Sequence, residues 1–297
     1  MLFRSPPGQC SHRTAAAPCR HRPRRPGSGE VARHNGPVRE GSIRRLAAGW
    51  LLPTPGRSRP APRVAWDWTD VVLFFGAYFL GLSLLSELFL SSAVQQFART
   101  LVHGLSAQQQ TALGNFAEQT AVYALAMIIV AGLAMGRRHA RLSDLGWRMP
   151  SWRWLPVAVV ASAACLVALT WLLNAEAGIV HVQNAQVATV RGEYGNQVGI
   201  ALVLLSVEVP LAEETFFRGF VYGWMRRQLN VPAAAVLSGC FFAAAHVSWG
   251  VTSEEILFLP LALLGTALAL LYEYSGSLLP GAVVHGIFNL VEALQIL

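Results

Sequence analysis

The sequence from 198 to 225 reads VGIALVLLSVEVPLAEETFFRGFVYGWM. It is long enough to cross the ~30 Å hydrocarbon core of a bilayer, which takes about 20 helical residues at ~1.5 Å each. Its polar centre nevertheless holds Glu208, Glu213, Glu214 and Arg218. An Asp, Lys or Arg at the centre of a membrane helix costs ~2.5 to 3.5 kcal/mol even on the lenient insertion scale. We therefore expect a spanning helix whose charged groups are compensated inside the protein.

The spacing of these charges separates two roles. Glu214 and Arg218 stand one helical turn apart and can pair in the order that suits the helix dipole. Glu213 points ~100° away from Glu214, so it is left free for another task. Pro210 removes a backbone donor just before the cluster, and a kink there would open room for water. The alternative interpretation is a wholly structural ion cluster that locks helices together.

The composition of the whole chain suits a membrane protein. Of the 297 residues, 54% are apolar and 13% are charged, and the mean hydropathy is +0.42. From Asp70 onward, apolar stretches alternate with short polar connections. We predict an all-α fold, a polytopic transmembrane helical bundle of about seven spans. The predicted spans are 70–92, 116–135, 154–173, 198–225, 232–249, 255–273 and 279–296.

The N-terminal part differs in composition from the rest of the chain. Residues 1–64 are rich in Pro, Gly and Ser and hold 13 of the 23 basic residues, all of them arginine. Because this segment lacks hydrophobic periodicity, we expect a disordered basic tail. The absence of lysine points to nucleotide-composition bias, so no nucleic-acid partner is predicted. We divide the chain into this tail, N-terminal transmembrane helices over 65–175 and a core over 198–297.

Two further apolar stretches carry histidines. Phe242 and His246 lie four residues apart, as do His285 and Asn289, so each pair shares one helical face. Counted from the ends of their helices at ~1.5 Å per residue, Glu213 and these polar groups lie roughly 12 to 21 Å into the membrane. Polar groups from three helices would then meet in one layer. Such convergence inside a helical bundle is typical of a functional site.

Three short motifs therefore follow one another along the last helices: Glu-Glu-x-x-x-Arg, Phe-x-x-x-His and His-x-x-x-Asn. They are formed by Glu213, Glu214 and Arg218, by Phe242 and His246, and by His285 and Asn289. This ordered set resembles the pattern of the CAAX prenyl protease and bacteriocin-processing (CPBP) family of intramembrane proteases. The resemblance covers about residues 198–297, and no motif position departs from it.

The resemblance implies a role for each motif residue. Glu213 and His246 would activate the attacking water, and His285 and Asn289 would stabilise the tetrahedral oxyanion. Donors in a low-dielectric pocket stabilise a developing negative charge far better than donors in water, which agrees with the second role. No Ser-His-Asp or Cys-His set competes with this one. The residues expected to support the site are Glu214, Arg218 and Phe242.

The implied function is that of an intramembrane endopeptidase, which hydrolyses CAAX-type prenylated or leader-peptide-like substrates associated with the membrane. Whether it is a metalloprotease is a separate question. Glu213, His246 and His285 could supply three zinc ligands with water in the fourth position. The His-Glu-x-x-His helix of soluble metalloproteases is absent. We favour a metal-independent reaction in which the glutamate activates water.

Two other classes of function were weighed. A membrane immunity or scaffold protein of the same family would recruit a partner without hydrolysis, since fold does not prove turnover. A transporter would also keep ionisable groups at the midplane, but no internal repeat is visible in the sequence. The expected partners are membrane lipid and a peptide substrate, and the sequence does not indicate an oligomeric state.

The arginines also predict an orientation. If the chain has seven spans, the tail, the segment from Arg137 to Arg153 and the pair Arg226 and Arg227 share one side of the membrane. Arginine-rich loops stay on the cytoplasmic side. We therefore expect an integral protein of a bacterial plasma membrane with its N-terminus in the cytoplasm.

This orientation can be tested by cysteine accessibility. In a chain whose four native cysteines are replaced by alanine, Ser151→Cys should resist a membrane-impermeant maleimide in intact cells and react after permeabilisation. The reason is that the loop containing Ser151 carries the arginines that hold it inside. Labelling of Ser151→Cys in intact cells would show that the orientation is reversed.

Overall fold

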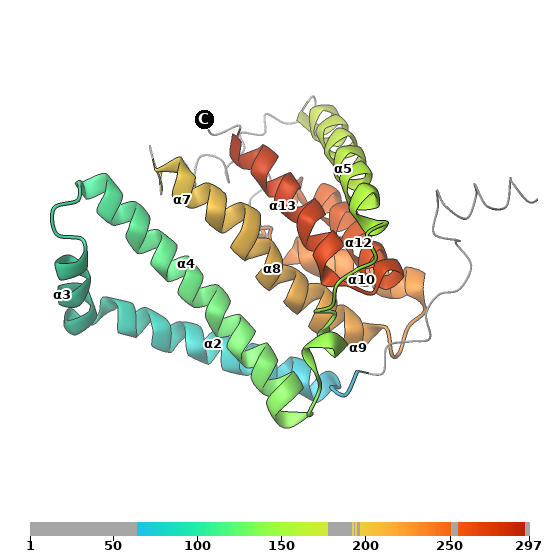
Figure 1. Cartoon of the computed structure of the whole chain (residues 1–297), viewed down its shortest axis with the longest axis horizontal. Coiled ribbons are helices and arrows are strands. Elements are labelled where there is room, and N and C mark those ends of the chain that lie inside the picture. The colour runs from blue at the N-terminus through green and yellow to red at the C-terminus, as the bar shows by residue number, and fades with distance from the viewer. Residues whose placement is uncertain (1–63, 178–191, 193, 195–196, 251–254, 295–297) are drawn as a thin grey trace, which may run out of the picture. The chain divides into compact units, whose positions relative to one another are not determined.

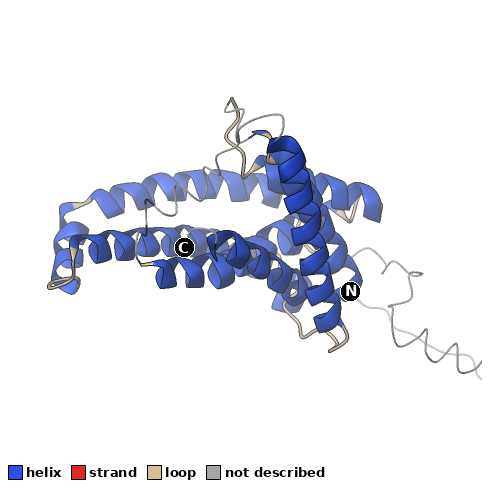
Figure 2. Cartoon of the chain, turned by 90° about the horizontal axis from the view of Figure 1, so that it is seen from above, coloured by secondary structure: helices blue, strands red, loops and turns tan. Residues whose placement is uncertain are grey.

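Helices make up every regular element of the structure, a computed structural model that describes residues 64–177, 192, 194, 197–250 and 255–294. This confirms the all-α prediction (Figure 1, Figure 2). The seven predicted spans all correspond to helical segments, with shifted ends. The predicted tail lies outside the described residues except for Val64.

Three of the described helices are long and apolar enough to cross a membrane: Trp68–Leu90, Ala107–Arg137 and Phe258–Ser275. Shorter apolar helices are Trp154–Ala168, Val231–Ala244 and Leu278–Val291. With the apolar composition, these helices identify the chain as an integral membrane protein.

The first two membrane helices form a hairpin. Helix α2, Trp68–Leu90, is followed by the short α3, Ser92–Leu101, and by α4, Ala107–Ala131, which runs back along α2 (Figure 1). A π-helical turn, η1, extends α4 over Gly132–Arg137. The predicted span 116–135 begins too late, because a capping box at Ser106 starts α4 earlier. Helix α3 was not predicted, and none of its residues is buried.

Ion pairs join the start of α2 to the end of η1. The fully buried Asp70 lies 3.3 Å from Arg137 and 2.8 Å from Arg138. Asp67, the N-cap of α2, lies 2.8 Å from Arg138 and accepts hydrogen bonds from Thr69. These hydrogen bonds and the charge of Arg138 lower the pKa of Asp67 to about 2, so its carboxylate is ionised at neutral pH. Ion pairs therefore hold the start of α2 against the end of η1.

The stretch 198–225 forms one helical run, which we call the central helix. Its α-helical and π-helical segments alternate along α7 Val198–Val203, η3 Leu204–Glu208, α8 Val209–Glu214, η4 Thr215–Tyr222 and α9 Gly223–Met225. Pro210 is the second residue of α8, which begins directly after a π-helical segment. The irregularity expected at Pro210 therefore takes the form of π-helical turns, which often mark functional sites.

Three C-terminal helices surround the central helix: α10 Val231–Ala244, α12 Phe258–Ser275 and α13 Leu278–Leu294. A further helix, α5 Trp154–Ala177, packs on α12 and α13 (Figure 1). Helices α10 and α12 cross closely, because a Cβ on Gly265 would come within 2.8 Å of Gly239 Cα. Helix α12 ends where Gly276 adopts the left-handed conformation, with a φ of 66°.

Candidate active site

The pairing predicted between Glu214 and Arg218 is present. Their side chains are fully buried, and Arg218 Nη1 lies 2.8 Å from Glu214 Oε1. The contact is ionic rather than an aligned hydrogen bond. Arg218 also donates from Nη2 to the carbonyl of Gly265 on α12 at 3.2 Å. The guanidinium lies 4.6 Å from the centre of the Phe242 ring on α10, within cation–π range.

Glu214 reaches α13 because Gly281 has no side chain. A Cβ at Gly281 would lie 3.0 Å from Glu214 Oε2, closer than most real contacts. On the same helix, His285 Nδ1 lies 3.3 Å from Glu214 Oε1. The buried ion pair is therefore in contact with α10, α12 and α13.

Glu213 faces a different set of groups, as its position on the helix predicts. Its Oε2 lies 3.4 Å from Nε2 of His246 and 3.7 Å from Nε2 of His285. Its Oε1 accepts a hydrogen bond from the hydroxyl of Tyr123 on α4 at 3.3 Å. Its side chain is 11% exposed. The carboxylate thus offers one oxygen to a hydroxyl and the other to two imidazoles.

His246 corrects one expectation. We placed it within a helix over 232–249, but α10 ends at Ala244 and His246 lies in the following turn. That turn leads to Gly250, whose positive φ of 92° favours glycine. The His246 ring still lies beside the ring of Phe242, with ring centres 4.3 Å apart, and its Nδ1 lies 2.7 Å from the Phe242 carbonyl oxygen. Its side chain is 25% exposed, against 4% for His285.

His285 lies between the two glutamates. Its Nε2 faces Glu213 and its Nδ1 faces Glu214. The Phe242 ring meets the imidazole edge-on, with centres 5.6 Å apart. One histidine of α13 therefore connects the ion pair to the carboxylate that was predicted to do the chemistry.

Asn289 makes a separate contact. It lies one turn beyond His285 on α13, and its Nδ2 donates to the backbone carbonyl of Leu205 at 2.9 Å. In the π-helical segment, the N–H of Val209 bonds five residues back, to Leu204. The next N–H in that pattern would bond to Leu205, but it belongs to Pro210, which has none. Asn289 therefore satisfies a carbonyl that the proline leaves without a partner.

Two hydroxyls of α4 that donate to carboxylates of the central helix were missed by sequence reasoning, and one of them, that of Tyr123, contacts the candidate site. Tyr123 donates to Glu213, and Thr120, on the same face of α4, donates to Glu208 Oε2 at 3.1 Å. Both belong to a long apolar helix, and neither belongs to a recognisable motif. The sequence offers no signal that separates these hydroxyls from others in membrane helices.

The zinc site considered from the sequence can be checked against the positions of the side chains. Within the described residues, no group of three or more His, Cys, Asp or Glu side chains could hold a metal ion. Glu213, His246 and His285, the ligands considered from the sequence, are included in that finding.

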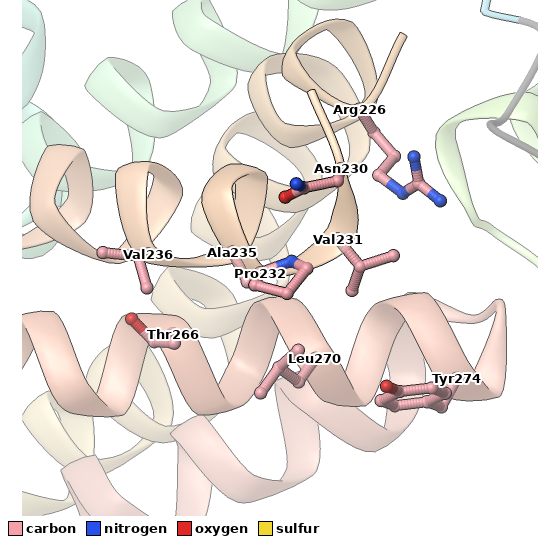
Figure 3. A pocket seen from close by; sticks show the side chains of 9 residues that line it. All are labelled: Arg226, Asn230, Val231, Pro232, Ala235, Val236, Thr266, Leu270 and Tyr274. Carbon is pink, nitrogen blue, oxygen red and sulfur yellow. The ribbon is translucent and has the colours of Figure 1, made fainter. Parts of the chain in front are cut away.

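A pocket of about 560 Å³ lies elsewhere, between the first turns of α10 and the later turns of α12 (Figure 3). Arg226, Asn230, Thr266 and Tyr274 are among its lining residues. None of the lining residues is Glu213, His246 or His285. The candidate site is therefore separate from this pocket.

The comparisons with known proteins agree with the resemblance. Residues 195–291 match the family model described as Type II CAAX prenyl endopeptidase Rce1-like. The matched region contains all three motifs, and it excludes α2, α4 and α5. Comparison with curated proteins and with solved structures finds no match.

The ion pair yields a stability prediction. Glu214→Gln and Arg218→Ala should each lower the free energy of unfolding by ~3 to 5 kcal/mol, because each leaves a buried charge without its partner. Thermal unfolding in detergent would measure the loss, with Arg99→Ala as the control, since Arg99 is exposed. If the melting temperatures of both variants equal that of the control, the ion pair does not stabilise the bundle.

Proposed function

We propose that the chain is an intramembrane endopeptidase, because residues 195–291 match the family model described as Type II CAAX prenyl endopeptidase Rce1-like. In this proposal it hydrolyses peptide bonds of membrane-associated substrates, of the prenylated CAAX type or resembling leader peptides. The observation that carries the proposal is the contact of Glu213 Oε2 with the imidazoles of both His246 and His285. A carboxylate and two imidazoles that are largely enclosed by helices can transfer a proton within a site that is shielded from solvent.

Glu213 acts as the general base in the proposed reaction. A water molecule that contacts Glu213 Oε2 and lies beside His246 Nε2 gives a proton to the carboxylate while its oxygen attacks the carbonyl carbon of the peptide. The tetrahedral intermediate then collapses and the C–N bond breaks. The proton passes from Glu213 to the leaving nitrogen, which gives an amine and a new carboxylic acid. His246, the most exposed group of the three, borders the side from which water and peptide enter.

His285 and Asn289 stabilise the oxyanion in this proposal. Nε2 of His285 lies 3.7 Å from Glu213, beyond hydrogen-bond distance, so it remains available to donate to a developing negative charge. Asn289 has a second N–H on its amide nitrogen besides the one given to Leu205. Donors that are fixed before the reaction stabilise the transition state most effectively. Glu214 and Arg218 hold the helix that carries Glu213.

We also propose where the enzyme works. It works in a bacterial plasma membrane in this proposal, and the arginine distribution supports an N-terminus in the cytoplasm. Its partners are membrane lipid and a peptide substrate. Nucleic acid is not among them.

The proposal is tested with the purified full chain in detergent and a fluorogenic peptide that carries an S-farnesyl cysteine before its last three residues. A leader-type peptide and the same peptide without the farnesyl group form the other arms. Glu213→Gln and His246→Ala should each lower turnover by about 10²- to 10⁴-fold, because the water loses its base or its second contact. Their melting temperatures should stay near that of the wild type.

Glu208→Gln is the matched control. Glu208 lies on the same central helix and accepts a hydrogen bond from Thr120 instead of facing an imidazole. Its loss should leave turnover unchanged. Near-normal turnover by Glu213→Gln would contradict the proposed mechanism. If no peptide is cleaved by a folded wild-type chain, a non-catalytic immunity or scaffold role explains the structure better.

A further inference from the structure

Two hydroxyls on one face of α4 reach two carboxylates on the central helix. Tyr123 donates to Glu213 Oε1 at 3.3 Å, and Thr120, one turn earlier, donates to Glu208 Oε2 at 3.1 Å. Residues three apart on a helix share a face, so α4 presents both donors to the same neighbour. Helix α4 lies outside residues 195–291, so the family match says nothing about these contacts.

The carboxylate of Glu213 needs such a contact if it is to act as a base. The last torsion of a glutamate side chain has a broad energy profile, so both oxygens can exchange places unless one of them is held. Tyr123 holds Oε1. Oε2 is buried and makes no hydrogen bond with any described group, so its lone pairs are available to a water molecule. The same oxygen is the one that faces His246 and His285.

We propose that Tyr123 is a positioning residue of the reaction, which holds Oε1 of Glu213 so that Oε2 is directed at the attacking water beside His246. This inference rests on the proposed function. Tyr123 touches neither water nor peptide in this scheme, and it acts through the orientation of Glu213. A catalytic group that is displaced by about 1 Å from its reactive position costs on the order of 10²-fold in rate. A hydrogen bond that prevents such a displacement therefore matters for the rate.

The test compares Tyr123→Phe with Thr120→Val in the purified full chain, using whichever peptide the wild type cleaves. Each variant removes one hydroxyl from the same face of α4 and one hydrogen bond to a carboxylate of the central helix. Tyr123→Phe should lower kcat roughly ten- to a hundredfold, which is the range for a lost hydrogen bond to a charged group. Its KM should stay unchanged, because the hydroxyl does not contact the substrate. Thr120→Val should keep both kcat and KM.

Melting temperatures separate positioning from a structural role. Tyr123→Phe and Thr120→Val should melt at similar temperatures, since each loses one comparable contact between α4 and the central helix. A kcat of Tyr123→Phe within about twofold of the wild type, with Glu213→Gln inactive, would overturn this inference and leave the proposed function intact. The inference would also be overturned if kcat fell equally in both α4 variants, in parallel with their melting temperatures. A different result contradicts the proposed function itself, namely turnover that is retained in Glu213→Gln.

Discussion

The guanidinium of Arg218 is fully buried in a membrane domain, where a lone cation costs several kcal/mol. Glu214 neutralises it from one turn away, at 2.8 Å. Neighbouring helices supply the remaining contacts: the carbonyl of Gly265 on α12 accepts from it, the ring of Phe242 on α10 covers it, and His285 on α13 contacts Glu214. The arrangement of the C-terminal helices is therefore tied to one ion pair. Moving any of these helices would leave part of that charge without a partner.

This constraint also directs Glu213. Because successive residues of a helix differ by ~100°, fixing Glu214 against Arg218 directs Glu213 at another face. On that face lie the imidazoles of His246 and His285 and the hydroxyl of Tyr123. His285 contacts both glutamates, so the ion pair and the carboxylate of Glu213 share one histidine. Rigid support of this kind is what a preorganised catalytic group requires.

Sequence reasoning found what depends on short spacing and missed what depends on the fold. The pairing of Glu214 with Arg218 follows from an interval of four residues, and the ordered motifs indicated that Glu213 would meet the histidines. The contact of Asn289 could not be predicted, because it depends on a carbonyl that Pro210 leaves free within a π-helical segment. The contact of Tyr123 joins helices 90 residues apart in the chain and belongs to no motif. The early end of α10, before His246, depends on a turn that hydropathy does not show.

The central claim is that Glu213 activates water directly and forms no covalent bond to the peptide. Single-turnover hydrolysis in water labelled with oxygen-18, followed by mass spectrometry of the product and of the protein, tests it. The account predicts that the label enters the newly formed carboxylate of the product and that Glu213 stays unlabelled. An unlabelled first product together with label on Glu213 would contradict it, because that result requires an acyl intermediate on the glutamate.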